Sequence, residues 1–211
     1  MNGVQLAGVL NFSNRETNGV QLSGVFNYSK VLRGVQFGLI NIADTSDGYS
    51  IGLINIILKG YHKLSFSVNE LMNLNAAFKT GNSKFYSILM AGMNISSSDD
   101  KAYSFGYGLG SEIDLNKRRT LSINPEIGSQ YVYLGSWDYL NLLNKVHLNV
   151  NVKLGKYVSL FAGPSYAVYI SDQPSGMKGY RFPLLPSGYR SHTFSNRVTG
   201  WLGWSAGINF F

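Results

Sequence analysis

Gly19-Val20-Gln21-Leu22-Ser23-Gly24-Val25-Phe26-Asn27 is one of four copies of a short phrase that opens the chain. The other copies occupy residues 3–11, 34–41 and, more loosely, 48–55, so the copies begin 16, 15 and 14 residues apart. This spacing is too short for repeats made of helix pairs and suits one β-strand followed by a turn. We therefore expect each copy to form one strand.

The alternation of side chains within a copy indicates what surrounds the strand, because residues i and i+2 lie on the same face of a sheet. In the second copy Val20, Leu22 and Phe26 share one face, whereas Gln21 and Asn27 share the other. One face is therefore apolar, and the other carries small or amide side chains. The third copy is one residue shorter, which predicts a β-bulge between neighbouring copies.

Identical amides on neighbouring strands can hydrogen-bond laterally. The repeats place such amides at equivalent positions in each copy, and we expect them to form ladders inside the wall that the strands build. These residues are Gln5, Gln21, Gln36, Asn11, Asn27 and Asn41.

The bulk composition favours a single all-β domain. The chain has 211 residues, of which 14% are charged, with 24 glycines and 29 aromatic residues (3 Trp, 14 Tyr and 12 Phe). No run of about 18 apolar residues exists, which excludes membrane-spanning helices. The lack of cysteine excludes disulfides and thiolate metal sites. No linker divides the chain, so we expect one domain over 1–211, with repeat-built strands at 1–58 and the remaining strands and loops at 59–211.

The formal net charge of +7 admits nucleic acid as a partner, but the basic residues are scattered and form no stripe between stacking aromatic residues. Contact with anionic lipid headgroups explains them as well, and we expect no nucleic acid partner. A signal peptide for export has a basic stretch followed by an apolar segment, and neither follows Met1. The sequence is therefore expected to be that of a mature or shortened chain.

Beyond the repeats the alternation continues over residues 103–113, 121–130, 146–154, 158–170 and 202–210. In these stretches apolar residues oppose Gly, Ser, Asn and Gln, whereas the outer face of a soluble sandwich carries many Lys, Glu and Thr. Apolar residues facing lipid and small polar residues facing a lumen are typical of a membrane β-barrel. Such a barrel must close, because an open edge would leave backbone groups unpaired in hydrocarbon.

The connections alternate in length, which predicts the orientation of the barrel. They are short near 81–83, 116–119 and 155–156 and long near 135–144 and 172–197. Bacterial outer-membrane barrels have short periplasmic turns, longer external loops and an even number of strands. Residues 62–80 form either one strand or a hairpin near Glu70, so the count is eleven or twelve. We predict an antiparallel transmembrane barrel of about twelve strands, monomeric, in a Gram-negative outer membrane.

Two segments carry a resemblance to known families. The repeated Gly-Val-Gln-x-Gly-x-x-Asn phrase resembles the bacterial outer-membrane β-barrel proteins with surface repeats that are described as surface antigens. Residues 160–166, with the last strand ending at Phe211, look like the closing strands of small outer-membrane barrels. The resemblance implies that the barrel-assembly machinery reads a C-terminal aromatic residue, either Phe210 or Phe211. It implies no established activity.

Charged and imidazole side chains on the polar face of consecutive strands form the first candidate site. We expect them to fill a narrow lumen as a network of ion pairs and amides, because a charge in the lumen must find a partner. A pore constriction or binding site is the alternative. These residues are Glu112, Glu126, Lys145, His147 and Lys153.

Aromatic and basic residues of the long loops form the second candidate site. They suit anchoring at the membrane interface, with the arginines on lipopolysaccharide phosphates. The alternative is recognition of a glycan or a partner protein. The residues are Trp137, Tyr139, Tyr180, Arg181, Tyr189 and Arg190. His62, His147 and His192 are too far apart in sequence to indicate a metal site, and no metal, cofactor or catalytic residue is predicted.

The sequence favours an outer-membrane barrel with a structural or narrow porin-like role, and not an enzyme. Two alternatives stay open. One is an outer-membrane lipid-modifying hydrolase, because His192 lies near Ser191 and Ser195 in the 172–197 region, although no Gly-x-Ser-x-Gly motif accompanies them. The other is a soluble β-solenoid with an adhesive role, because short Gly-rich repeats also build solenoids.

Overall fold

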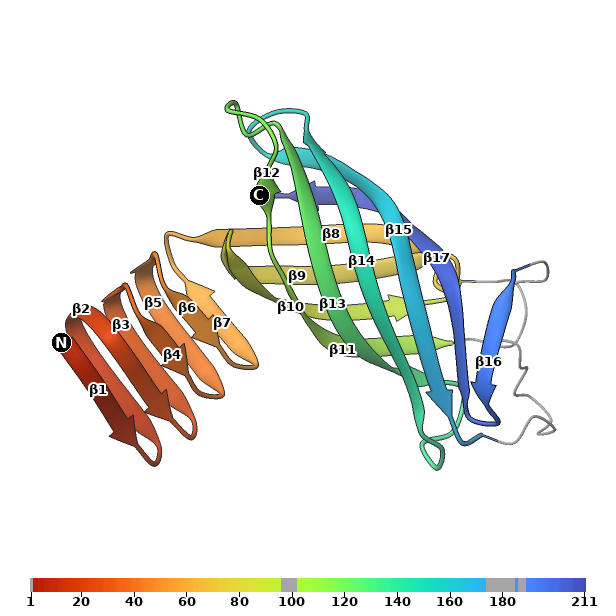
Figure 1. The fold of residues 1–211 in the computed structure, drawn as a ribbon, viewed down its shortest axis with the longest axis horizontal. Helices are drawn as coiled ribbons and strands as arrows, with labels where there is room; N and C mark the ends of the chain where they lie inside the picture. The colour runs from red at the N-terminus through yellow and green to blue at the C-terminus, as the bar shows by residue number, and fades with distance from the viewer. Residues whose placement is uncertain (1, 96–101, 174–184, 186–188) are drawn as a thin grey trace.

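A computed structural model describes residues 2–95, 102–173, 185 and 189–211. The described chain is all-β and has two parts, a stack of short parallel strands and a larger antiparallel barrel (Figure 1). Within the described ranges, no helix is long and apolar enough to cross a bilayer.

The four repeats form the parallel part, which we call the repeat stack (residues 2–58). One sheet has the order β1-β2-β4-β6 and the other β2-β3-β5-β7, with the long strand β2 contributing to both. The strands are β1 (Asn2–Ala7), β2 (Leu10–Ser23), β3 (Phe26–Leu32), β4 (Val35–Phe37), β5 (Ile40–Ser46), β6 (Tyr49–Ile51) and β7 (Ile54–Ile57).

Parallel pairing brings equivalent residues of successive repeats into register, and the predicted amide ladders follow from it. Gln21 pairs with Gln36 and Asn27 with Asn41. Asn27 Nδ2 donates to Asn41 Oδ1 at 2.8 Å, and Gln36 Nε2 donates to Gln21 Oε1 at 2.8 Å. The prediction of lateral ladders is confirmed. The coils lie so close that a Cβ at Gly34 would meet the carbonyl oxygen of Gly19 at 1.8 Å, which requires glycine there.

The repeats were expected to form the first strands of the barrel, and this is wrong. They pair in parallel with one another, because a repeat of about 15 residues returns the chain to the same position one coil further along. Strand alternation looks the same in parallel and antiparallel sheets, so it does not reveal the partner. The predicted bulge is present, as a register shift between Ser13 and Glu16 where β2 meets β3.

The second part is an antiparallel barrel that closes through the pairs β11–β13 and β17–β8. Eight strands form it in the described part of the chain: β8 (Tyr61–Asn69), β9 (Leu74–Asn82), β10 (Phe85–Met93), β11 (Tyr103–Gly110), β13 (Leu121–Tyr133), β14 (Asn141–Lys153), β15 (Val158–Ser171) and β17 (Val198–Phe210). The short strands β12 (Ile113–Asp114) and β16 (Ser191–Ser195) pair antiparallel with β13 and β17, respectively.

The barrel therefore has eight strands rather than about twelve, because the repeat strands do not join it. Residues 62–80 were expected to form either a single strand or a hairpin, and they form the hairpin β8–β9. An eight-stranded barrel is just wide enough for side chains to fill its interior. Outward positions of the wall are apolar and exposed, as at Leu64, Ile127 and Leu148, whereas inward positions such as Ser65 and Asn149 are polar and buried.

The two ends of the barrel differ. The turns at 83–84 and 154–157 and the C-terminal Phe211 lie at one end, which we call the turn end. The described residues 70–73, 94–95, 102, 134–140, 172–173 and 189–190 lie at the other end, which we call the loop end (Figure 1). The turns predicted near 81–83 and 155–156 are short, but the turn predicted at 116–119 belongs to the longer connection 111–120, which includes β12. The connection at 70–73 is short although it lies at the loop end, so the predicted alternation is present only in part.

The last coil of the repeat stack packs on the outer face of the barrel near its turn end (Figure 1). The Tyr107 hydroxyl of β11 donates to the carbonyl oxygen of Gly52 at 2.5 Å. Asn82 Nδ2, at the end of β9, donates to the carbonyl oxygen of Gly48 at 2.5 Å. Asn55 Nδ2 donates to Ser87 Oγ of β10. The barrel wall therefore closes one end of the stack.

Candidate functional site in the barrel lumen

Three ion-pair tiers cross the barrel interior from the turn end to the loop end. At the turn end Lys63 of β8 and Glu112 form an ion pair, and Lys153 Nζ lies 3.4 Å from the other oxygen of Glu112. The Tyr61 hydroxyl donates to Glu112 Oε2 at 2.8 Å. The Glu112 side chain is 5% exposed, so its charge depends on these partners.

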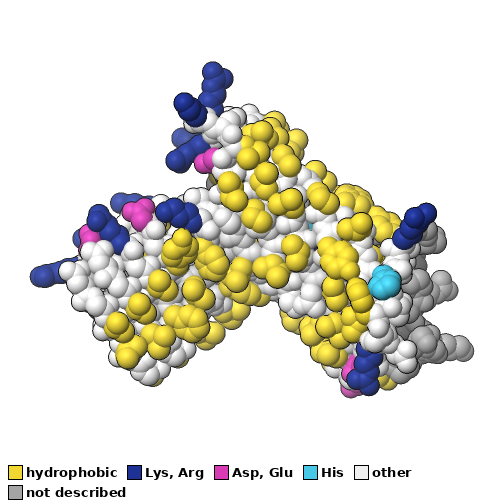
Figure 2. All heavy atoms as spheres, in the orientation of Figure 1, with side chains coloured by type: hydrophobic (Ala, Val, Ile, Leu, Met, Phe, Trp, Pro, Cys, Tyr) yellow, Lys and Arg dark blue, Asp and Glu magenta, His cyan; other side chains and the backbone are white. Residues whose placement is uncertain are grey.

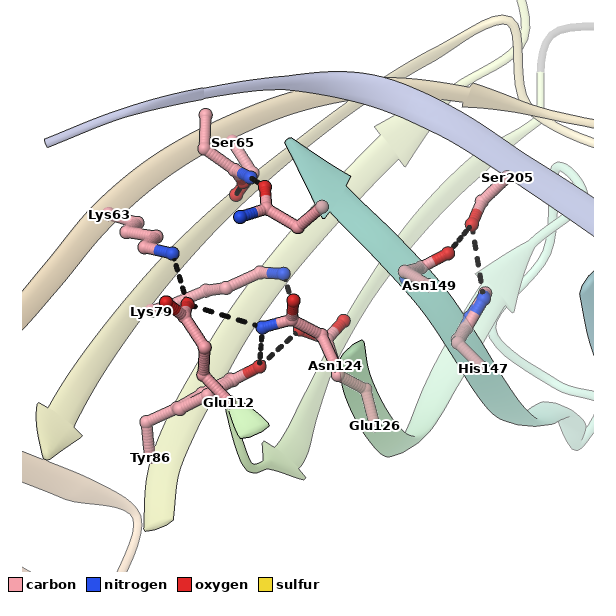
Figure 3. A network of polar contacts seen from close by, with 12 residues as sticks. Lys63, Ser65, Lys79, Tyr86, Glu112, Asn124, Glu126, His147, Asn149 and Ser205 are labelled. Atoms are coloured by element: carbon pink, nitrogen blue, oxygen red, sulfur yellow. Dashed lines mark hydrogen bonds and ion pairs between the residues drawn. The ribbon is translucent and has the colours of Figure 1, made fainter. Parts of the chain in front are cut away.

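The middle tier joins β9, β10 and β13 (Figure 3). Lys79 Nζ lies 2.5 Å from Glu126 Oε1, and the Tyr86 hydroxyl donates to the same oxygen at 2.7 Å. Asn124 Nδ2 donates to the Tyr86 hydroxyl at 3.1 Å and reaches Glu112 at 3.4 Å. Asn124 therefore links the middle tier to the turn-end tier.

Glu70 forms the third tier, although it lies in the tight connection after β8. Lys145 Nζ of β14 donates to Glu70 Oε1 at 2.6 Å, and Trp201 Nε1 donates to the same oxygen at 3.0 Å. The backbone N–H of Trp204 donates to Glu70 Oε2 at 3.1 Å. The side chain of Glu70 is fully buried. Hydrogen bonds to both oxygens hold this carboxylate in the ionised form that pairs with Lys145.

Apolar side chains close the lumen beyond the third tier. They pack as one buried cluster at the loop end: Leu71, Met72, Val132, Leu143, Ala167, Tyr169, Leu185 and Trp201. At the turn end the Phe211 ring lies over two lysines, with its centroid 4.5 Å from Lys63 Nζ and 5.6 Å from Lys153 Nζ. Ion pairs, apolar packing and an aromatic ring therefore fill successive levels of the barrel.

Two cavities remain in and beside this network. The first, of about 70 Å³, lies in the barrel between the middle and loop-end tiers and is lined by Lys79, Glu126, Lys145 and His147. His147 Nδ1 of β14 lies 3.4 Å from Ser205 Oγ of β17, the next strand but one in the wall (Figure 3). The second, of about 350 Å³, opens at the turn end beside Arg119. The inner cavity is large enough for a few water molecules.

The lumen carries a small positive excess. The four lysines Lys63, Lys79, Lys145 and Lys153 face three carboxylates, which leaves one positive charge. Lys153 is the member that reaches solvent, since its side chain is 25% exposed at the turn end. The network can therefore hold charges inside a narrow barrel, and in the described part of the chain each of these three carboxylates is paired with a lysine.

The five predicted lumen residues lie in the barrel interior, but in different tiers. Glu112 and Lys153 share the turn-end tier, Glu126 belongs to the middle tier, and Lys145 belongs to the loop-end tier. His147 faces the cavity between the last two. They meet through partners that were not predicted, namely Lys63, Lys79 and Glu70.

Two of the partners that were not predicted could have been identified from the sequence. Lys63 and Lys79 alternate with the outward Leu64 and Phe78, which indicates an inward side chain. The pattern predicts the wrong direction for Glu70, because its even number continues the series of outward residues on β8. The connection after Asn69 turns its side chain into the lumen, and alternation does not extend through a turn.

The predicted external-loop residues are spread over the loop end. Trp137 is 65% exposed and stacks on Tyr131 at 5.4 Å, and the carbonyl oxygen of Tyr139 accepts a bond from the Tyr131 hydroxyl at 2.8 Å. The Tyr189 hydroxyl accepts a bond from Trp204 Nε1 at 2.8 Å. Arg190 is exposed beside β16. Tyr180 and Arg181 lie outside the described residues.

The two C-terminal aromatic residues point in different directions. Phe210 faces outward and packs edge-on against Phe66 of β8, with ring centroids 6.2 Å apart. Phe211 covers Lys63 and Lys153 at the turn end of the lumen. The outward residue of the last strand is thus Phe210.

His192, on which the hydrolase alternative depends, lies on the exposed strand β16. Its ring meets Phe194 edge-on at 4.8 Å, and Ser191 and Ser195 are exposed with it. No hydrogen bond between His192 and either serine is present among the described residues, so the pair lacks the geometry of an activated nucleophile. Comparison of the chain with protein-family models, with curated proteins and with solved structures finds no match.

Proposed function

We propose that this protein is an integral β-barrel of a Gram-negative outer membrane, with a closed lumen and a structural, surface-exposed role. The observation that carries the proposal is the inverted arrangement of the barrel, which buries paired charges and exposes apolar side chains. Such a surface is unfavourable in water and favourable in hydrocarbon. The closed strand order leaves no open edge in the barrel wall, as a bilayer requires.

The outward apolar side chains of neighbouring strands support this location. Half-exposed Val, Leu and Ile cover the wall over several strands, as on β14, where Val146, Leu148, Val150 and Val152 alternate with inward Lys145, His147, Asn149 and Asn151. Figure 2 shows this apolar surface on the visible side of the barrel. The expected partners are outer-membrane lipid, lipopolysaccharide and, by resemblance, the barrel-assembly machinery.

An aromatic cluster at the loop end supports placing that end at a membrane interface. The ring centroids of Tyr133 and Trp137 are 4.7 Å apart, and those of Phe105 and Trp137 are 6.0 Å apart. Aromatic rings with a polar group favour the headgroup region of a bilayer. The exposed Trp137 keeps recognition of a glycan or partner protein open as a further role of this surface.

The filled lumen favours a structural role over a channel. An ion on the barrel axis would have to pass the Phe211 ring, three ion-pair tiers and the buried cluster at the loop end. Separating a buried pair leaves uncompensated charges, which is strongly unfavourable. We therefore propose that the protein has no transport activity. The proposal also retains the expectation of a monomer without a catalytic step, metal or cofactor.

The test combines refolding with conductance measurement. The full chain refolded in detergent or phosphatidylcholine vesicles is expected to migrate differently on gels before and after heating, and the barrel is expected to resist added protease. Reconstituted in a planar bilayer, it should give no discrete conductance steps. Clean solubility of the folded chain without detergent contradicts the membrane location. Reproducible single-channel steps contradict the closed lumen alone and restore the narrow-channel interpretation.

A further inference from the structure

The repeat stack has an inverted interior of its own. Most of its core consists of amide ladders, in which Asn11 donates to Asn27 at 2.9 Å and Asn41 donates to Asn55 at 2.7 Å. A small apolar cluster of Leu32, Ala43 and Ile57 is buried beside them. These side chains are almost completely buried. The residues on the outside of both sheets are apolar instead. A stack with this arrangement gains little from the hydrophobic effect in water, because its apolar surface stays exposed.

The apolar side chains form columns that run along the stack. The corner between the two sheets, which we call the apolar corner, consists of Val9, Val25, Leu39 and Leu53. Beside it on the first sheet stand Leu6, Leu22, Phe37 and Ile51, and on the second sheet Leu10, Phe26, Ile40 and Ile54. All four corner residues are at least 41% exposed, and Leu6 is 68% exposed.

The charges of the stack lie at the opposite edge, where each coil passes from one sheet to the other. We call this the charged edge. All seven charged residues of residues 1–60 fall there: Arg15, Glu16, Lys30, Arg33, Asp44, Asp47 and Lys59. Figure 2 shows them along one margin of the stack, with apolar side chains below them that continue toward the barrel.

Each outer column next to the charged edge contains one tyrosine among apolar residues. Tyr49 stands at the end of the Val column of the first sheet, and Tyr28 stands on the second sheet, where its hydroxyl donates to Asp44 at 3.0 Å. From the apolar corner outward, the surface therefore stays apolar, gains one tyrosine on each sheet, and then becomes charged. Side chains follow the same order from the acyl chains of a bilayer to its headgroups.

We infer that the apolar corner of the repeat stack inserts into the lipid bilayer beside the barrel and leaves the charged edge at the headgroups. The inference rests on the proposed function, which it extends from the barrel to the repeats. Apolar side chains cover both faces and the corner between them, which suits immersion in hydrocarbon better than a partner protein docking on one side. The apolar surface is also continuous with that of the barrel (Figure 2).

The charged edge limits the depth of the insertion. Its seven charged side chains favour the headgroups over the acyl chains. A depth of roughly 5–10 Å, typical of elements that lie in the interface, immerses the apolar corner and the adjoining columns and leaves the charged edge outside the hydrocarbon.

The test uses the absence of native cysteine in the chain. Single cysteines carrying an environment-sensitive fluorophore replace Leu39 at the apolar corner, Lys30 at the charged edge and Ile127 on the barrel wall. Each full-length variant is refolded into phosphatidylcholine vesicles that contain a nitroxide lipid, with the nitroxide either near the headgroup or at the chain end. Heat-dependent gel migration verifies the fold of each variant.

We expect lipid nitroxides to quench the probe in Leu39→Cys, the headgroup-proximal nitroxide more strongly, and aqueous iodide to quench the probe in Lys30→Cys. A Leu39→Cys probe that responds like the Lys30→Cys probe, while the Ile127→Cys probe is quenched by lipid, overturns the inference and leaves the proposed function intact. If the Ile127→Cys probe is not quenched by lipid, the proposed function fails and the inference fails with it.

A second copy of the chain is the competing occupant of the apolar corner. It predicts a Leu39→Cys probe that neither iodide nor lipid nitroxides quench, and energy transfer between copies that carry donor and acceptor labels. That outcome overturns the inference. Leu53→Cys, in the same column one coil further along, is expected to reproduce the Leu39→Cys result.

Discussion

Asn55, in the last coil of the repeat stack, donates a hydrogen bond to Ser87 on the outer face of barrel strand β10. Each earlier asparagine of the ladder donates to the next asparagine, so Ser87 takes the place of the next repeat. The Ser87 hydroxyl also lies 3.1 Å from the Tyr107 hydroxyl, which donates to Gly52. The barrel therefore supplies the polar surface on which the ladder ends.

Ser87→Ala is expected to loosen the last coil of the stack. The substitution removes the acceptor of one buried amide hydrogen, which costs roughly 1–3 kcal/mol. Amide hydrogen exchange and protease cleavage should increase over residues 48–57, with little change in the barrel. Ser23→Ala is the matched control, because the Ser23 hydroxyl is buried without a hydrogen-bond partner among the described residues. Equal effects of both substitutions would contradict the capping role of Ser87.

Gly203→Ala is expected to destabilise the barrel. A Cβ at residue 203 would lie 2.5 Å from the Glu70 carboxylate, which Lys145 and Trp201 hold in place. Overpacking of this kind costs typically about 1–3 kcal/mol, measured as a lower urea midpoint for loss of the heat-modifiable form. Gly155→Ala is the control, since nothing lies within 4 Å of a Cβ there. An unchanged midpoint for Gly203→Ala would show that the Glu70 tier tolerates displacement.

Glu70→Gln is expected to destabilise the barrel more than any surface charge change. It leaves the buried ammonium of Lys145 without its carboxylate, at a cost of about 3–5 kcal/mol. Adding Lys145→Met should recover much of the loss. Urea unfolding followed by tryptophan fluorescence measures both effects. The control is Glu16→Gln, which weakens the exposed pair with Arg33 and should cost about 1 kcal/mol or less. A double variant as unstable as Glu70→Gln would contradict the pairing argument.

Phe210→Ala is expected to reduce barrel assembly more than Phe211→Ala. Phe210 is the outward aromatic residue of the last strand, whereas Phe211 packs over Lys63 and Lys153 at the turn end. If the assembly machinery reads the outward residue, the heat-modifiable fraction recovered from bacterial membranes falls for Phe210→Ala. Phe211→Ala should instead lower the urea midpoint with a near-normal yield. The reverse order of yields would assign the assembly signal to Phe211.

The all-β class could be predicted because period-2 alternation is a local property of the chain. The repeats also placed amides at equivalent positions, but the ladders form because the strands pair in parallel, which aligns Gln21 with Gln36. Whether neighbouring strands pair in parallel or antiparallel is not a local property of the chain. Alternation in Gly19–Asn27 suits an antiparallel barrel strand and a parallel coil equally well. The predicted count of about twelve barrel strands was too high because the repeat strands were counted as strands of the barrel.

The lumen site shows the same division. Glu112, Glu126, Lys145, His147 and Lys153 could be placed inside because each alternates with apolar neighbours. Their partners depend on which strands face one another across the barrel. Glu126 meets Lys79 across 47 residues of chain, and Glu70 meets Trp201 across 131. The number of strands and the way the barrel closes determine such pairs, and the residues of a single strand specify neither.

By itself the sequence determined the apolar and polar faces of the strands and the repeat period, because these follow from the order of neighbouring residues. Only the tertiary structure decided that residues 2–58 stack in parallel, that eight later strands close a barrel, and that Ser87 ends the asparagine ladder. Those outcomes depend on which distant backbone edges meet, and identical local patterns allow more than one such pairing.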